Sequence, residues 1–205
     1  SSKNISNLYN ANLLFGIYIL ESLLELKETK FINTGSQWQH ASGENNYDPM
    51  NLYSATKEAF EKILTYYHNS KNVNAVNLII HDTYGSTDNR KKLFNSLVEC
   101  LQNKNELKVT EGKQLIDYVY INDIINGYLI AKDKILNKKS KFPQTFSLGS
   151  QKPLSVRKFI KIFENISKKS MNIKFGGISY RGNEQFKIWY EKQLPGWKPE
   201  ISLIK

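Results

Sequence analysis

A tyrosine and a lysine lie four positions apart, at Tyr53 and Lys57, and a segment that precedes them ends in a serine, Ser36. A spacing of four residues places the two side chains on one face of a helix. The phenol of a free tyrosine has a pKa near ~10, and a neighbouring ammonium group favours the phenolate and lowers that pKa. With the Ser36 hydroxyl to hold the reacting oxygen, the pair could pass a proton to or from a substrate alcohol or ketone.

The spacing by itself is not specific, because it recurs at Tyr67/Lys71 and Tyr128/Lys132. Only Tyr53 and Lys57 follow a predicted buried strand that ends in a hydroxyl residue, and only they open an apolar-periodic helix. For the other two pairs we expect exposed helix positions. The predicted chemistry therefore belongs to Tyr53 and Lys57.

Helical and strand patterns alternate along the chain, which is typical of a parallel α/β sheet. Residues 73–80 form an almost continuous β-branched run, as expected for a strand covered on both faces. Apolar periodicity predicts helices over residues 7–26, 51–67, 90–102, 121–136 and 155–168. Strands are expected over residues 30–33, 73–80, 107–110, 118–120, 145–148 and 172–175.

Several short motifs follow one another in the order found in a known family. They are Asn10–Gly16, Phe31–Ser36, Tyr53/Lys57, Thr83-Tyr84-Gly85, Asp117–Asp123, Phe146–Ser150, Arg181–Glu184 and Gly196–Pro199. In this order the chain resembles the extended short-chain dehydrogenase/reductase family of nucleotide-sugar epimerases, reductases and dehydratases. The resemblance covers nearly the whole chain.

The resemblance implies an α/β fold with a Rossmann-like parallel sheet and a small α+β substrate lobe. Residues 1–82 and 123–149 would form the second half of the cofactor domain, and residues 83–122 and 150–205 the lobe. The family usually forms homodimers through two helices per subunit, here those beginning near residues 7 and 51. The residues matched to catalysis are Asn12, Ser36, Tyr53 and Lys57, and those matched to cofactor binding are Thr34, Tyr53 and Lys57.

The family holds the pyrophosphate of its NAD or NADP at a glycine-rich turn. This chain contains neither G-x-x-G-x-x-G nor G-x-G-x-x-G, and its first residues resemble a middle helix of the family. We therefore expect the N-terminal half to be absent from the sequence. The alternative is a complete chain that is a non-catalytic relic or a module that binds sugar nucleotides. The residue that discriminates NAD from NADP would lie in the absent half, so both cofactors stay open.

The residues after Ser36 separate the activities within the family. Dehydratases place an Asp-Glu pair there to eliminate water, whereas this chain has Gln37 and Trp38. Reduction and 4-epimerisation remain. The nearest resemblance is to the branch of CDP-paratose and CDP-abequose synthases, which implies reduction of a nucleotide-linked 4-keto-(di)deoxyhexose in bacterial surface polysaccharide biosynthesis.

The same resemblance implies where a nucleotide-diphosphate sugar would bind. Arg181 matches an arginine that contacts the diphosphate, a role suited to a guanidinium fork. Asp82 replaces a substrate-binding asparagine, and Arg90 could supply a cation where Ile116 replaces another family arginine. The expected substrate-binding residues are Gln37, Trp38, Asp82, Arg90 and Arg181.

Composition excludes other classes of protein. The net charge of +10 comes from scattered lysines with only three arginines, so we expect no nucleic-acid partner. Three histidines and one cysteine give no metal-ligand spacing and exclude an internal disulfide. No apolar run approaches the ~20 residues that span a bilayer. We expect a cytoplasmic protein without a membrane partner.

Overall fold

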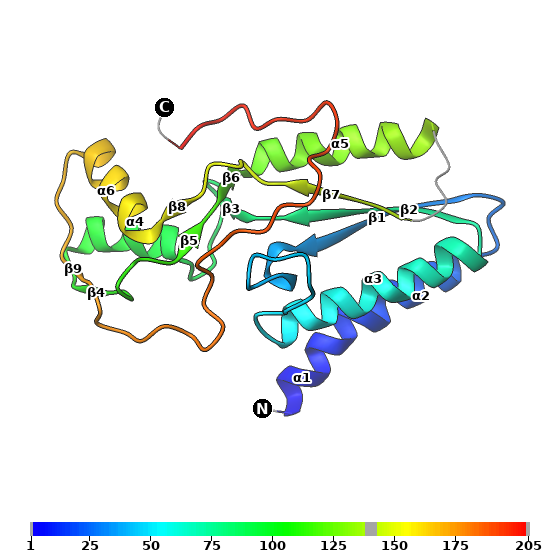
Figure 1. The fold of residues 1–205 in the computed structure, drawn as a ribbon, viewed down its shortest axis with the longest axis horizontal. Coiled ribbons are helices and arrows are strands. Elements are labelled where there is room, and N and C mark those ends of the chain that lie inside the picture. Colours follow the sequence, from blue (N-terminus) through cyan, green and yellow to red (C-terminus); the bar gives the residue numbers. More distant parts are fainter. Residues whose placement is uncertain (1, 138–142, 204–205) are drawn as a thin grey trace.

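The computed structural model describes residues 2–137 and 143–203. Its central sheet contains β1 (Thr29–Ser36), β2 (Val73–Ile80) and β7 (Gln144–Leu148), in the order β1-β2-β7 and all parallel (Figure 1). β1 is longer than the predicted strand at residues 30–33, because it pairs with β2 along its whole length, from Thr29 opposite Val73 to Ser36 opposite Ile80. The predicted parallel α/β sheet is confirmed.

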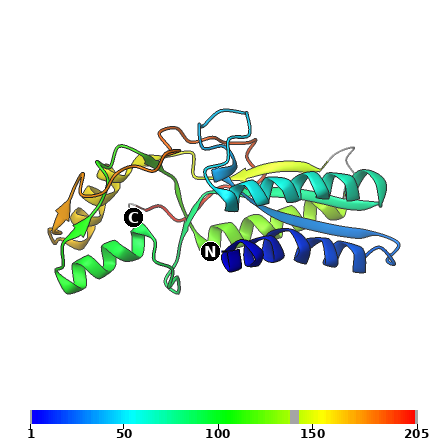
Figure 2. The ribbon, with the colours of Figure 1, turned by 90° about the horizontal axis from the view of Figure 1, so that it is seen from below.

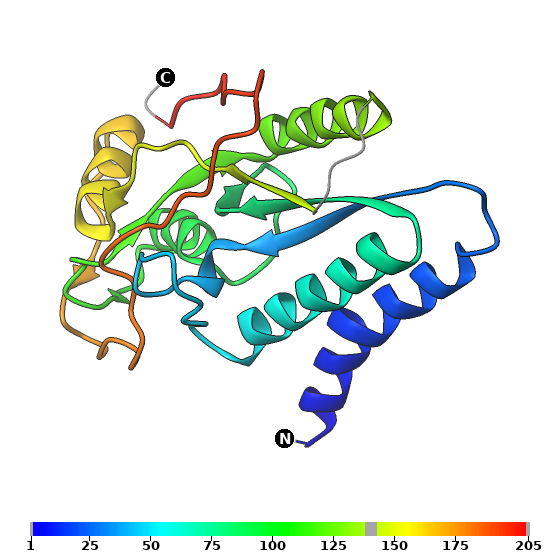
Figure 3. The ribbon, with the colours of Figure 1, turned by 45° about the vertical axis from the view of Figure 1, so that its right-hand side comes forward.

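Two helical layers cover this sheet. The N-terminal helical segment and α3 (Leu52–Ser70) lie side by side on one face, and α5 (Ile121–Asn137) lies on the other (Figures 1 and 3). The N-terminal segment consists of α1 (Ser2–Tyr9), a π-helical stretch η1 (Asn10–Leu14) and α2 (Phe15–Ser22). It ends at Ser22 rather than at the predicted residue 26. Asn51 caps α3, since its side chain accepts a hydrogen bond from the Ser54 amide at 3.1 Å.

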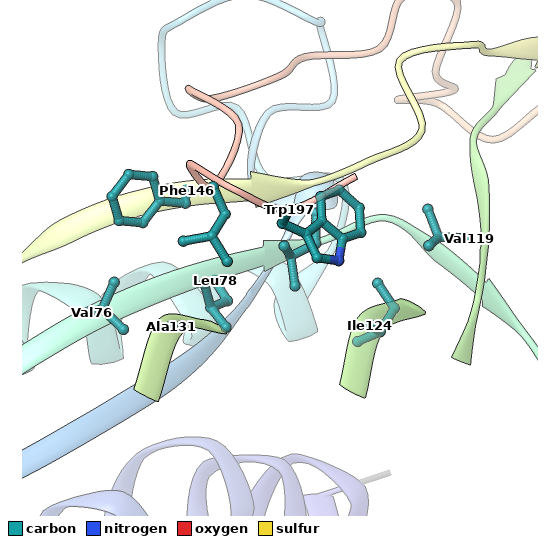
Figure 4. Packing of buried hydrophobic residues seen from close by; sticks show 9 residues of the cluster. Val76, Leu78, Val119, Ile124, Ala131, Phe146 and Trp197 are labelled. Carbon is teal, nitrogen blue, oxygen red and sulfur yellow. The ribbon is translucent and has the colours of Figure 1, made fainter. Parts of the chain in front are cut away.

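Alternate residues of the central strands pack against opposite layers, as the two-residue period of a strand requires. Val73 and Ala75 pack with the helices α2 and α3, whereas Val76 and Leu78 pack with α5. Figure 4 shows the second cluster, in which Trp197 from the C-terminal segment fills the space over the sheet. The indole Nε1 of Trp197 also donates a hydrogen bond to the Asp123 carbonyl oxygen at 2.7 Å.

A second group of elements lies beyond the carboxyl ends of the strands (Figure 1). It contains α4 (Leu93–Asn103) and α6 (Val156–Ser167), which enclose an aromatic core with Phe94, Tyr118 and Phe159. It is accompanied by three two-stranded pairs: β3 (Asp82–Tyr84) with β6 (Tyr118–Tyr120), β4 (Leu107–Lys108) with β9 (Ile173–Lys174), and β5 (Leu115–Ile116) with β8 (Leu154–Ser155).

Strands β3, β5 and β8 were not predicted, whereas the equally short β4, β6 and β9 lie within predicted strands. The division into a cofactor domain and a substrate lobe stays a prediction. Among the helices of the described ranges, none is both long and apolar enough to cross a membrane.

Candidate active site

The candidate site lies where the parallel strands of the central sheet end. Ser36 is the last residue of β1, and Asp82 follows the end of β2 by two positions. Ser36 also begins the short 3-10 helix η2 (Gln37–Gln39), where its Oγ accepts a hydrogen bond from the Trp38 amide at 3.3 Å. The Ser36 amide donates to Gln39 Oε1 at 2.8 Å. These hydrogen bonds hold Ser36 at the carboxyl end of β1.

Tyr53 and Lys57 occupy the first turns of α3. The Lys57 ammonium nitrogen lies 5.8 Å from the centroid of the Tyr53 ring, as expected for a pair on one helix face. Burial raises the pKa of Tyr53 above its usual value, and the charge of Arg90 opposes this effect. The predicted lowering of the Tyr53 pKa is therefore wrong for this structure. Burial of Lys57 lowers the pKa of its ammonium group, an effect that the nearby Glu61 carboxylate opposes.

The raised pKa of Tyr53 determines which form of its side chain is present at neutral pH. At neutral pH the Tyr53 phenol keeps its proton and can donate it, which suits a general acid better than a general base.

Asn12 lies within the π-helical stretch, a type of helix distortion that often marks functional sites. Its Nδ2 donates to Thr56 Oγ1 at 2.9 Å, and Thr56 Oγ1 donates to the Tyr53 carbonyl oxygen at 2.8 Å. Asn12 thereby ties the N-terminal helix to the turn of α3 that carries Tyr53 and Lys57. Its part in the reaction stays a prediction.

Thr34 faces α5, where its Oγ1 lies 2.5 Å from the hydroxyl of Tyr128. Tyr128 is half-buried, and Tyr67 is buried with its hydroxyl donating to Glu21 Oε1 at 2.5 Å. The expectation that these two tyrosines lie at exposed helix positions is wrong. Both are on helix faces that pack against neighbouring elements, which the four-residue spacing alone does not reveal.

A cavity of about 420 Å³ opens beside the strand ends. Trp38, Asp82 and Arg181 line it together, although they are far apart in the sequence. The Arg181 guanidinium carbon lies 5.7 Å from the centroid of the Trp38 ring. Gln37 does not line this cavity but lies behind Asp82, with its Nε2 donating to Asp82 Oδ2 at 3.2 Å. Gln37 is 1% exposed, and its Oε1 has no hydrogen-bond partner in the described structure.

Arg90 does not line the cavity. Its guanidinium group forms an ion pair with Asp88 at 2.6 Å and also contacts Thr83 Oγ1 at 3.3 Å. The following residues, Lys91 and Lys92, line the cavity and bring positive charge to it. The sequence interpretation did not single out Lys92.

Asp82 and Glu184 are the acidic residues that line the cavity. Burial raises the pKa of Asp82 to about 6, and Asp117 acts in the same direction, whereas Lys92 and Arg181 oppose the shift. The cavity therefore combines cationic side chains, an aromatic ring and a carboxyl group that titrates near neutral pH.

A buried polar cluster supports this region from behind. The Asp117 carboxylate accepts hydrogen bonds from the Tyr190 hydroxyl at 2.8 Å and from the Ser150 hydroxyl. His81 stacks on Tyr190, and its Nε2 lies 2.8 Å from Ser147 Oγ. Burial lowers the pKa of His81 to about 4, so the ring is neutral at pH 7.

Two further buried residues, Gln39 and Glu61, lie directly behind Ser36. The sequence interpretation missed both. A signal for Glu61 was present, because it extends the row of Tyr53 and Lys57 by another four residues. Over the part of the chain that the structure describes, no cluster of His, Cys, Asp and Glu side chains could hold a metal ion.

Comparison with known proteins gives a consistent result. Residues 1–149 match the model of the NAD dependent epimerase/dehydratase family. CDP-abequose synthase of Salmonella typhimurium (strain LT2) is 28% identical over an alignment that covers 100% of this chain and 69% of that protein. CDP-abequose synthase of Yersinia pseudotuberculosis is 28% identical, with 87% of this chain and 61% of that protein covered.

Among solved structures, UDP-glucuronic acid 4-epimerase from Bacillus cereus, in complex with UDP-glucuronic acid and NAD, has the same fold. Its TM-score is 0.83 at 22% identity, with 96% of this chain and 64% of that chain covered. The chain thus spans about two thirds of the length of the proteins that it matches.

Proposed function

The chain belongs to the NAD-dependent epimerase/dehydratase family, and from that premise we propose that it acts as an NAD(P)-dependent reductase of a nucleotide-linked 4-keto-(di)deoxyhexose. The protonated Tyr53 phenol beside Lys57 on α3 carries this proposal. In such a reduction Tyr53 donates its proton to the keto oxygen, Ser36 holds that oxygen by a hydrogen bond, and the Lys57 ammonium stabilises the phenolate that remains.

The identity of the residues around Ser36 supports reduction rather than elimination. Gln37 and Trp38 offer no acid or base for the loss of water. A 4-epimerase begins by removing a proton from a sugar hydroxyl and starts from the Tyr53 phenolate, whereas a reduction starts from the phenol, the form that burial favours. Epimerisation is the second candidate, since the same Tyr53, Lys57 and Ser36 could carry it out and the family includes epimerases.

The donor set at Tyr53 and Lys57 fits the ribose that adjoins a nicotinamide ring. Neither the phenol nor the ammonium group donates a hydrogen bond within the described part of the chain, and they lie on one helix face, where Tyr53 is 38% exposed and Lys57 is partly buried. They are therefore free to bind ribose hydroxyls, whereas Thr34 faces α5 and its part in cofactor binding stays a prediction. When bound, the nicotinamide supplies the hydride of the reaction.

The cavity supports a nucleotide-diphosphate sugar as substrate. Lys91, Lys92 and Arg181 offer the cations that a diphosphate requires, and Trp38 offers a flat apolar surface. Asp82 can accept hydrogen bonds from sugar hydroxyls. Reduction of a CDP-linked sugar for surface polysaccharide is the specific case that the relatives suggest.

The test is a reduction assay on the intact protein. NADH or NADPH is mixed with a panel of nucleotide-linked 4-keto-6-deoxy and 4-keto-3,6-dideoxy sugars, and the absorbance of the reduced nicotinamide is followed. We expect consumption that depends on the keto-sugar and falls at least ~100-fold in Tyr53→Phe, because general acid catalysis contributes about 10²–10⁴. Tyr66→Phe is the matched control, since Tyr66 is an exposed residue of the same helix and should retain full activity.

The other outcomes separate the alternatives. Interconversion of 4-hydroxy epimers without net consumption of the reduced cofactor would establish an epimerase. If neither reaction occurs but the nucleotide sugar binds, the protein is a binding module. Equal rates for the wild type and Tyr53→Phe would contradict the assignment of the acid.

A further inference from the structure

Glu61 is a buried carboxylate to which the proposed reaction gives no part. It lies on α3 one helical turn after Lys57 and two turns after Tyr53, in the same row of side chains. Its side chain is buried, yet both carboxylate oxygens have partners. Oε1 accepts a hydrogen bond from Gln39 Nε2 at 3.1 Å, and Oε2 accepts one from the Tyr47 hydroxyl at 3.4 Å.

Gln39 connects this carboxylate to the candidate serine. It is fully buried, and its Oε1 accepts the Ser36 amide hydrogen at 2.8 Å. A side-chain amide has one accepting and one donating end, whereas an ionised carboxylate only accepts. The Glu61 carboxylate therefore fixes the orientation of the Gln39 amide, so that its oxygen points to the Ser36 backbone.

The atoms around Gly35, Gln39 and Glu61 are closely packed. A Cβ built on Gly35 would lie 2.8 Å from Glu61 Oε1 and 3.0 Å from Gln39 Oε1. The backbone just before Ser36 is thus pressed against both side chains. The Glu61 carboxylate therefore lies close to the end of β1.

The charges around Glu61 connect it to the proton-transfer pair as well. On its own helix it faces Lys57, Glu58 and Lys62, and the 37–50 segment adds Tyr47 and Gln39. Figure 3 shows how this segment leads from the end of β1 to the start of α3. Burial raises the pKa of Glu61, and the hydrogen bonds from Gln39 and Tyr47 and the charge of Lys62 oppose that shift.

We propose that Glu61 is a positioning residue of the active site, which holds the Ser36 backbone through Gln39 and supports the charge of the Lys57 ammonium. It links two catalytic segments, the end of β1 and the first turns of α3, that otherwise come from separate elements. The catalytic importance of this role rests on the proposed function. The hydrogen bonds from Glu61 through Gln39 to Ser36 are a property of the fold and do not depend on that function.

The test compares Glu61→Leu, Glu61→Gln and the matched control Glu58→Gln. Leucine removes both hydrogen bonds and the charge. Glutamine removes the charge but keeps a carbonyl oxygen for Gln39. Glu58→Gln removes a charge from the same helix one turn earlier and leaves Gln39 untouched.

The first measurement is exchange of the Ser36 amide hydrogen in the intact protein. We expect at least tenfold faster exchange in Glu61→Leu, a change of less than threefold in Glu61→Gln, and none in Glu58→Gln. Unchanged exchange in a folded Glu61→Leu protein would overturn the proposal. If Glu61→Leu does not fold, Glu61→Ala, which also removes both acceptor oxygens and the charge but keeps Gln39, provides the same comparison.

The second measurement is the pH profile of kcat in the reduction assay. Loss of the Glu61 charge lowers the pKa of Lys57 further, so the alkaline fall in rate should move to lower pH in Glu61→Gln by more than in Glu58→Gln. The KM values for sugar and cofactor should stay within about twofold of the wild type. Equal shifts in the two variants would overturn the electrostatic part. An inactive wild type would refute the proposed function, while the exchange data would still decide the link.

Discussion

At the scale of single residues, burial determines which ionisable groups of this site carry charge. His81 and Asp82 are adjacent in the sequence, and burial shifts their pKa values in opposite directions, to about 4 for His81 and about 6 for Asp82. Burial disfavours the charged form of each group. The charged form is the protonated imidazolium for His81 and the deprotonated carboxylate for Asp82, so the two pKa values move in opposite directions. Tyr53 follows the same rule, which keeps its phenol protonated.

The Asp82 shift predicts a dependence of stability on pH. The pKa of Asp82 lies near 6 in the folded protein against 3.8 for an ordinary aspartate, so ionised Asp82 lowers the free energy of unfolding above pH 6. Asp82→Asn should raise that free energy by roughly 1–3 kcal/mol at pH 7.5 and have no effect below pH 4. Urea denaturation at several pH values measures both.

The control is Asp88→Asn, which should have the opposite effect. The Arg90 guanidinium holds the pKa of Asp88 at about 2, so removal of this carboxylate lowers stability at neutral pH. An Asp82→Asn effect that is the same at pH 4 and pH 7.5 would contradict the assignment.

At the scale of elements, the connection from β1 to α3 is the segment that brings the catalytic groups together. The C-terminal segment holds it in place, as Figure 2 shows where the two run side by side. The His40 ring stacks between Tyr47, at 5.0 Å between ring centroids, and Trp189, at 3.7 Å. His40 Nδ1 also lies 3.1 Å from the carbonyl oxygens of Glu44 and Asn46. These contacts hold the loop against itself and against the C-terminal segment.

Close packing at the end of β1 gives a prediction for Gly35. A Cβ there would lie 2.4 Å from Ile79 Cδ1, which is closer than real atoms approach. Gly35→Ala should therefore lower the free energy of unfolding by about 1–3 kcal/mol, the usual cost of overpacking a core. Chemical denaturation measures the change.

Two variants check the cause. Ile79→Val removes the Cδ1 atom, so the double variant should recover part of the loss. Gly182→Ala should change stability by less than about 0.5 kcal/mol, because a Cβ at Gly182 meets no atom within 4 Å. Full additivity of Gly35→Ala and Ile79→Val would contradict the steric explanation.

At the scale of the whole molecule, the helical layer that covers one face of the sheet has an apolar outer surface. Phe15 and Tyr18 of α2 are 64% and 65% exposed, and Tyr66 of α3 is 53% exposed. α2 and α3 lie side by side, so these side chains belong to one helical layer (Figure 3). Large apolar side chains exposed together on one layer are typical of interaction surfaces, and a second copy of the chain is the partner that the family resemblance implies.

We therefore predict that Phe15→Glu together with Tyr18→Glu converts a dimer to a monomer, because buried unpaired carboxylates oppose association. Sedimentation velocity measures the mass of the particle. Ile166→Glu, on the exposed surface of α6, is the control and should leave the dimer intact. A dimer that persists in the double variant would place the interface elsewhere.

The sequence by itself determined the features that depend on local pattern. The strand at Val73–Ile80, the main helices and the Tyr53/Lys57 pair follow from periodicity and spacing, because these reflect contacts within a few residues of the chain. The motif order also predicted the family that the comparison found. The observed helix ends differ from the predicted ones by several residues, because capping and packing determine where a helix ends.

Only the tertiary structure decided which side chains meet and how deeply each is buried. It brought Trp38, Asp82 and Arg181 to one cavity, placed Arg90 outside it, and joined Ser36 to Glu61 through Gln39. It also reversed the expected pKa shift of Tyr53. The physical reason is that desolvation and hydrogen bonding depend on neighbours from distant parts of the chain, and no local pattern records them.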